Sequence, residues 1–115
     1  MANSGRDWRL IIREELEILA SEQEQVDYEK RVPHVDITQE LLCGWFDDSY
    51  YPDDDEFRSW FTPSELEAMA SFNAFFDERT ALLPESHGTV QNWLNCPAWR
   101  GVMLEAQKTL SLIPA

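Results

Sequence analysis

Apolar positions near the start of the chain recur with helical spacing. They are Trp8, Ile11, Ile12, Leu16, Leu19 and Ala20. Most neighbours in this set are three or four residues apart, which places them on one face of a helix. Asp7 or Ser4 can cap the first turn, because a short side chain with an oxygen acceptor satisfies the free backbone N–H groups there. The pattern predicts a helix over about residues 7–25.

The next stretch, residues 26–37, does not keep this spacing. Val26 and Tyr28 alternate with polar residues, as do Val35 and Ile37, and a proline lies between the two pairs. Proline disfavours helical backbone at the residue before it. We therefore expect an irregular connector around residues 26–37, which can include a short extended piece.

A second helix is predicted after this connector, with Asp36 or Thr38 as its cap. Its apolar positions are Leu41, Leu42, Trp45 and Phe46. Gly44 lowers the intrinsic stability of the helix. The helix must end by about Asp48, because residues 49–53 (Ser-Tyr-Tyr-Pro-Asp) are typical of a turn.

Two further helix starts follow. The acids at residues 53–56 suit the first turn of a short helix through Trp60, because the helix dipole favours negative charge there. Residues 62–65 (Thr-Pro-Ser-Glu) form a capping box with proline at the first helical position. The helix after it has two adjoining apolar stripes, a width that predicts the central helix of the fold. The stripes are Leu66, Met69, Ala70, Phe76 and Leu83, and then Ala68, Phe72, Phe75 and Leu82.

The last third of the chain supplies the remaining helices. We expect residues 84–88 to end the preceding helix, Thr89 to cap a short turn through Leu94, and Pro97 to lie near the start of a final helix. The stripe of that helix is Trp99, Val102, Met103, Ala106, Leu110 and Ile113. The 115 residues contain no internal repeat and no low-complexity linker. We predict one all-α domain over residues 1–115, a bundle of four or five helices.

The charge and composition of the chain argue against several classes of protein. Lysine and arginine number 9 and aspartate and glutamate 22, so the formal net charge is -13. Nucleic acids and anionic membranes bind proteins through cations, so we expect neither as a direct ligand. No apolar run approaches the roughly 20 residues that span a bilayer, and no signal peptide is predicted. Cys43 and Cys96 are too sparse for a disulfide scaffold, so we expect two separate buried thiols and a cytoplasmic protein.

Most of the excess charge lies in the middle of the sequence. Residues 36–67 contain ten acids and one base, and therefore carry -9 of the total -13. Half of the aromatic side chains lie within residues 45–61, interleaved with these acids. Clustered carboxylates repel one another, and a cationic partner would relieve that repulsion and be steered to this region. The alternative is a solvated charge run that serves solubility alone.

The rings of this region divide into an expected core and an expected surface. Phe46, Phe57 and Phe61 are expected in the core, since phenylalanine rings are usually buried. Tyr50 and Tyr51 lie in a turn beside a proline, where each can present a flat apolar face and a hydroxyl to a partner. The candidate partner-binding residues are Asp47, Asp48, Tyr50, Tyr51, Asp53, Asp54, Asp55, Glu56 and Trp60.

Patterns for catalysis and metal binding are weak. His34 and His87 have no cysteine or histidine at metal-ligand spacing. The three aspartates at residues 53–55 lack the alternating ligands and central glycine of a calcium loop. Asp47 and Asp48 form the one pair placed where one carboxyl could be buried and the other ionised, but no nucleophile or phosphate-binding loop supports them. We expect no catalytic residues, no metal site and no cofactor.

Four segments carry a resemblance to a known class of proteins: residues 42–52 (LCGWFDDSYYP), 61–66 (FTPSEL), 72–75 (FNAF) and 95–100 (NCPAWR). Together they resemble small bacterial immunity proteins of polymorphic and contact-dependent growth inhibition toxin systems, over roughly residues 40–110. The resemblance implies a cytoplasmic protein without catalysis that binds and neutralises the toxic domain of a cognate toxin, often a nuclease with a basic groove. A carboxylate surface complements such a groove. The resemblance assigns no site residue.

Other interpretations stay open. One is a protein that mimics nucleic acid to block nucleases, or a small acidic adaptor or chaperone. A mimic would inhibit several unrelated DNA-binding proteins, whereas an immunity protein recognises one cognate partner. Another is a carboxylate enzyme, whose turnover would be lost on changing Asp47 or Asp48.

Overall fold

The fold is helical over residues 6–84 and 89–115, which are the residues that the computed structural model describes. In chain order the elements are α1 (Trp8–Ala20), α2 (Glu22–Arg31), α3 (Ile37–Cys43), the π-helix η1 (Gly44–Ser49), α4 (Asp55–Ser59), α5 (Pro63–Thr80), α6 (Val90–Leu94) and α7 (Pro97–Ser111). Within these ranges no residue lies in a strand, which confirms the predicted all-α class. Five of the described helices, α1, α2, α3, α5 and α7, have seven or more residues, in keeping with the predicted bundle.

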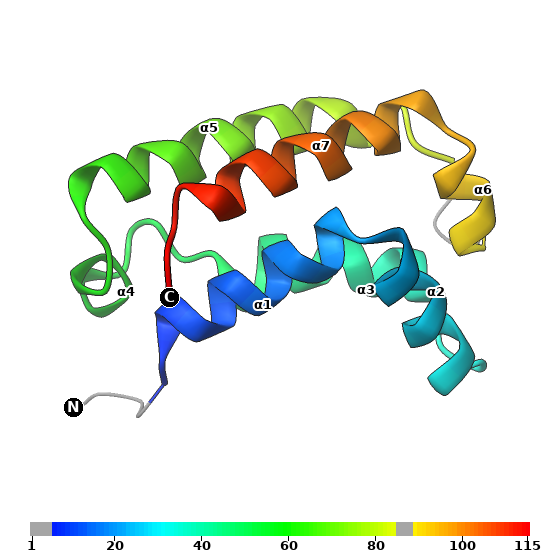
Figure 1. Ribbon diagram of the computed structural model, residues 1–115, viewed down its shortest axis with the longest axis horizontal. Helices are drawn as coiled ribbons and strands as arrows, with labels where there is room; N and C mark the ends of the chain where they lie inside the picture. The colour runs from blue at the N-terminus through cyan, green and yellow to red at the C-terminus, as the bar shows by residue number, and fades with distance from the viewer. Residues whose placement is uncertain (1–5, 85–88) are drawn as a thin grey trace.

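The helices form two layers, and α7 makes contacts in both of them. Helices α5 and α7 run side by side in one layer, while α1 packs on α7 from the other layer and lies in front of α3 (Figure 1). Helices α2 and α6 meet at one end, and α4 lies at the opposite end. The sequence predicted α5 as the central helix, but α7 contacts α1, α5 and α6. Two residues of the stripes predicted for α5 face solvent: Ala70, whose side chain gains little from burial, and Leu82, which lies beyond the end of the helix at Thr80.

Aromatic rings fill the space between the layers. Trp45 stacks on Tyr50 with ring centroids 4.9 Å apart and meets Phe72 of α5 edge-on at 4.9 Å. Trp99 of α7 lies 4.6 Å from Trp93 of α6. The largest fully buried side chains are Trp45, Trp93, Trp99, Phe57, Phe72 and Phe76. Each aromatic ring can bury about 150–250 Å², so this cluster dominates the hydrophobic stabilisation of the fold.

The helix predicted over residues 7–25 divides at Ser21. This residue has extended backbone (φ -118°, ψ 116°) and ends α1. Its side chain also accepts the Glu24 N–H at 3.1 Å and so starts α2. One serine therefore serves as the end of one helix and the cap of the next.

The irregular connector predicted around residues 26–37 is correspondingly shorter than expected. Helix α2 continues to Arg31, and only residues 32–36 form a turn before α3. The first turn of α2 carries acids and its last turn carries bases, as the helix dipole favours. These end charges and the Ser21 cap compensate for an apolar pattern too weak to predict the helix.

Gln25 fixes the angle between these two helices. Its side chain is fully buried, and its amide nitrogen donates to the carbonyl oxygens of Ile18 (2.9 Å) and Leu19 (3.1 Å) at the end of α1. Its amide oxygen accepts the indole N–H of Trp99 at 3.0 Å. A single polar side chain thereby bonds two carbonyl oxygens at the end of α1, one of which also accepts the Ser21 N–H, and orients a core ring.

The other predicted helix starts are confirmed. Asp36 caps α3 and Asp54 caps α4. Thr62 opens α5 with a complete capping box, Thr89 caps α6, and Pro97 is the first residue of α7. These signals are local, which is why the sequence alone predicts them.

Arg9 holds one corner of the fold together. Its guanidinium forms a bidentate ion pair with Glu65 and donates to the carbonyl oxygens of Trp60 (2.9 Å) and Pro114 (2.8 Å). Glu65 also accepts the Thr62 N–H at 2.8 Å, so the capping box and the ion pair share one carboxylate. The hydrogen bonds from Arg9 hold the pKa of Glu65 below its usual range. We call these five residues the Arg9 corner.

The remaining single-residue predictions have mixed outcomes. Cys43 and Cys96 are free thiols, as predicted, but both are half-buried rather than buried. His34 is exposed in the turn between α2 and α3, whereas His87 lies outside the described residues. Across the described ranges, no helix is both long enough and apolar enough to span a bilayer.

Candidate partner-binding surface

The acids singled out in the sequence lie on the end of η1, the following turn and the start of α4. We call them the acidic surface: Asp47, Asp48, Asp53, Asp54, Asp55 and Glu56. All are exposed except Glu56, which is half-buried. Among the described residues, no base lies within salt-bridge distance of any of the six, although Glu22, Glu65 and Glu105 elsewhere are paired. The charge of this surface is therefore not neutralised within the described fold.

Hydrogen bonds fix the backbone that carries these acids. The Tyr51 hydroxyl donates to the Asp47 carbonyl oxygen, and the Arg58 guanidinium donates to the Pro52 carbonyl oxygen at 3.1 Å. The Asp54 carboxylate accepts the Phe57 N–H at 3.0 Å as the cap of α4. Because the turn is already ordered, a partner that binds here loses little free energy to ordering it.

The two tyrosines have different positions. Tyr50 is only 8% exposed, since its ring stacks on Trp45 and meets Phe57 edge-on at 5.9 Å. The prediction that Tyr50 presents its ring to a partner is therefore wrong, and burial raises the pKa of its hydroxyl. Tyr51 retains 37% exposure, as a surface anchor requires.

The phenylalanines largely follow the prediction. Phe57 and Phe61 are buried, which confirms them as core residues. Phe46 is half-buried and packs on Phe76 of α5 with ring centroids 4.8 Å apart. Its partial exposure leaves it at the edge of the surface as well as at the edge of the core.

The structure brings Tyr51 and two of the acids together around one hollow. This hollow has a volume of about 380 Å³ and is lined by Phe46, Tyr50, Tyr51, Pro52, Asp53 and Asp54. We call it the Tyr51 hollow. Aromatic and proline side chains supply its apolar lining, and the two aspartates supply negative charge. The other four acids lie outside this lining.

Trp60 does not line the Tyr51 hollow. It is 37% exposed and borders a smaller hollow of about 210 Å³ beside the start of α1. The residues around that hollow are Asp7, Arg9, Leu10, Arg13, Trp60 and Ala115. The nine candidate residues therefore do not form one continuous pocket.

The first turn of α1 lies between these two regions. Trp8 meets Tyr51 edge-on with ring centroids 5.2 Å apart. Leu10, two residues further on, borders the hollow beside Trp60 and is 51% exposed. Sequence reasoning missed Leu10 because it lies off the buried stripe of α1. A leucine that lies off the buried stripe of a helix is the sequence signal that could have indicated it.

A second residue that sequence reasoning missed is Glu15. Its half-buried carboxyl lies against η1, and a Cβ atom at Gly44 would come within 2.6 Å of one Glu15 carboxyl oxygen and 2.9 Å of the other. Glycine at position 44 therefore leaves the space that the carboxyl occupies. Glu15 lies seven residues after Trp8 and four before Leu19, so its place on the buried stripe was readable from the spacing.

Glu15 also changes the interpretation of the acidic pair. Burial, and then the nearby charge of Asp48, raise the pKa of Glu15 to about 7. The sequence suggested that Asp47 and Asp48 could differ in environment, but both are exposed. The contrast between a buried and an exposed carboxyl lies instead between Glu15 and Asp48.

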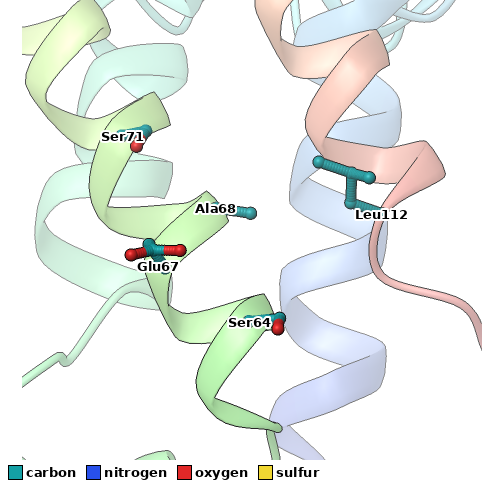
Figure 2. A pocket seen from close by; sticks show the side chains of 5 residues that line it. All are labelled: Ser64, Glu67, Ala68, Ser71 and Leu112. Carbon is teal, nitrogen blue, oxygen red and sulfur yellow. The ribbon is translucent and has the colours of Figure 1, made fainter.

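A further hollow lies between α5 and the end of α7, and it differs in character from the Tyr51 hollow. It has a volume of about 420 Å³ and is lined by Ser64, Glu67, Ala68, Ser71 and Leu112. Ala68 points towards Leu112 across the gap between the helices (Figure 2). No aromatic ring belongs to this lining. Within residues 6–84 and 89–115, no group of three or more histidines, cysteines or acids is arranged to hold a metal ion.

Comparison with known protein families, curated proteins and solved structures finds no match to this chain.

Proposed function

We propose that this protein binds and neutralises a basic toxin domain, as a cytoplasmic bacterial immunity protein does, and that it acts by occupation of the toxin rather than by catalysis. The observation that carries the proposal is the acidic surface: six carboxylates without a salt-bridge partner in the described fold, held on a turn fixed by its own hydrogen bonds. The resemblance of residues 40–110 to immunity proteins points to the same class.

Electrostatic complementarity supports a cationic partner. A nuclease domain needs a groove rich in lysine and arginine to hold phosphates, and a carboxylate surface is attracted to such a groove. Attraction of this kind mainly raises the association rate and weakens as salt increases. A partner that covers Asp53 and Asp55 would also relieve the repulsion between them, which favours the complex over the free protein.

The proposal is tested by affinity capture from the native organism with the full chain as bait, at low and moderate salt. One bait carries Asp53→Asn, Asp54→Asn and Asp55→Asn, because asparagine preserves the cap of α4 while removing charge. The matched control carries Glu40→Gln, Glu67→Gln and Asp77→Asn, which remove the same charge from exposed positions on α3 and α5.

We expect the natural chain and the control to capture one dominant partner that carries a toxin or nuclease domain, and the Asp53–Asp55 variant to lose most of it. A spread of unrelated basic proteins that disappears with salt would overturn the proposal and favour a nucleic-acid mimic instead. Equal losses with both variants would show that net charge, and not the acidic surface, determines capture.

A further inference from the structure

We propose that the Tyr51 hollow is the binding site for one arginine side chain of the partner. The inference rests on the proposed binding function and names the group that would anchor it. Tyr51, Asp53 and Asp54 carry the argument, because together they offer the ring and the carboxylate oxygens that a guanidinium requires.

The Tyr51 ring is exposed and yet fixed in position. Its hydroxyl donates to the Asp47 carbonyl oxygen, and its ring meets Trp8 at 5.2 Å with an interplanar angle of 66°. A ring restrained at both ends loses little conformational freedom when a ligand stacks on it. Tyr51 remains 37% exposed and lines the hollow, so a planar cation in the hollow can contact its side chain.

The two aspartates of the hollow keep acceptor capacity for such a cation. One Asp54 oxygen accepts the Phe57 N–H, and an ionised carboxylate can accept further bonds through its other oxygen. Asp53 is exposed and has no hydrogen-bond or ion-pair partner among the described residues. Arg58, the base nearest in the sequence, donates to the Pro52 carbonyl oxygen rather than to either carboxylate.

The protein already uses the same combination of groups elsewhere. The Arg9 guanidinium carbon lies 5.6 Å from the centre of the Phe61 ring while Arg9 pairs with Glu65. The Arg79 guanidinium carbon lies 3.8 Å from the centre of the Phe75 ring while Arg79 pairs with Glu78 at 2.6 Å. In both places an arginine contacts a ring and a carboxylate together.

The Tyr51 hollow presents the ring and the carboxylates of this arrangement, with no arginine of the described chain paired to its acids. A metal ion fits the lining less well, because calcium takes six to eight oxygen ligands and only two lining residues are acids. Lysine fits less well than arginine, because its ammonium is compact, strongly hydrated and unable to stack or to bind two oxygens in a fork.

The inference can be tested without the natural partner. A blocked glycine–arginine–glycine tripeptide is titrated into the ¹⁵N-labelled full chain at low salt, and amide shifts are followed by NMR. Two further tripeptides separate shape from charge: lysine in place of arginine keeps the charge without the planar group, and citrulline keeps the planar shape without the charge. The variants are Tyr51→Leu and the pair Asp53→Asn with Asp54→Asn, and the control pair is Glu67→Gln with Asp77→Asn.

We expect saturable shifts confined to residues 46–54, with a dissociation constant on the order of 1 mM, severalfold weaker binding of the lysine peptide and none of the citrulline peptide. Both variants should lose the shifts and the control pair should keep them. The asparagine pair preserves the α4 cap, so its result stands even if Tyr51→Leu proves unstable.

Equal binding of arginine and lysine peptides, or shifts spread over all exposed acids, would overturn the proposal that the Tyr51 hollow binds arginine. That failure is distinguishable from failure of the proposed function. A toxin captured at the acidic surface, with an affinity that Tyr51→Leu leaves unchanged, would retain the binding role and remove only the arginine anchor.

Discussion

The Arg9 corner and the acidic surface use the same kinds of side chain in opposite ways. At the corner, Glu65 is almost buried, with 8% of its side chain exposed, and Arg9 and Thr62 satisfy its oxygens. At the acidic surface, most of the carboxylates lie in solvent, and none of them is paired with a base of the described fold. A buried charge stabilises a fold only where partners compensate for its lost hydration, whereas exposed unpaired charges remain available to another molecule.

Glu15 combines one property of each region. Like Glu65 it is packed into the structure, against Gly44, and like the acidic surface it has no basic partner among the described residues. The pKa values of Glu15 and Glu65 accordingly shift in opposite directions: burial raises that of Glu15, and the hydrogen bonds from Arg9 lower that of Glu65. Pairing, rather than burial alone, determines whether a carboxylate stabilises this fold.

The largest expected effect comes from breaking the Arg9 corner. Arg9→Ala leaves the Glu65 carboxylate buried without its cation and frees the carbonyl oxygens of Trp60 and Pro114. We expect the free energy of unfolding to fall by about 2–3 kcal/mol in urea denaturation. Arg79→Ala is the matched control, since its pair with Glu78 is exposed and should contribute less than about 1 kcal/mol. Equal losses from the two substitutions would contradict the distinction.

The second effect, of opposite sign and with a similar upper limit, is expected at Glu15. The pKa of its carboxyl is about 7 in the folded protein, whereas the ordinary value is 4.5. Between these values the folded protein binds a proton that the unfolded chain does not, so the free energy of unfolding should fall as pH rises from about 4.5 to 7. Glu15→Gln removes this loss and should stabilise the protein at pH 8 by at most about 3 kcal/mol. Urea denaturation at pH 5 and pH 8 measures it.

Two variants check the cause of this pH dependence. Glu14→Gln changes an exposed neighbour and should leave the pH dependence in place. Gly44→Ala puts a methyl group where the Glu15 carboxyl lies and should push that carboxyl towards water, so the pH dependence should shrink. Its net effect on stability is expected within about 1 kcal/mol, because alanine also favours the helix. A pH dependence that survives Gly44→Ala would show that Gly44 does not position Glu15.

The smallest effect on stability is expected at the acidic surface. Changing Asp53, Asp54 and Asp55 to asparagine relieves repulsion between exposed charges. The free energy of unfolding should rise by less than about 1 kcal/mol, which a slightly higher melting temperature would report. The gain should vanish at high salt, where such charges are screened. A marked destabilisation at both salt concentrations would mean that these acids stabilise the fold beyond the α4 cap of Asp54, which asparagine preserves.

Local signals account for most of what the sequence predicts correctly. The capping box at Thr62 and Glu65 and the proline at the start of α7 involve residues adjacent in the chain, so their outcome depends little on the rest of the fold. Helix α2 was missed because its apolar pattern is weak and its stability comes from the Ser21 cap, its end charges and the contact of Gln25 with distant Trp99. That last contact joins residues far apart in sequence, which spacing cannot show.

The candidate surface was predictable only where it depends on local sequence. The unpaired acids follow from the shortage of bases in residues 36–67. The different burial of Tyr50 and Tyr51 does not follow from the sequence. It depends on Trp45 and Phe57, which pack against Tyr50. The position of Trp60 away from the Tyr51 hollow likewise depends on the first turn of α1, which packs between them.

The most direct test of the binding role is the association rate with the captured partner as a function of salt, for the natural chain, the Asp53–Asp55 asparagine variant and the Glu40, Glu67 and Asp77 control. We predict slower association and a flatter salt dependence for the asparagine variant, with the control close to the natural chain. Identical rates and identical salt dependence for all three proteins would contradict a partner-binding role for the acidic surface.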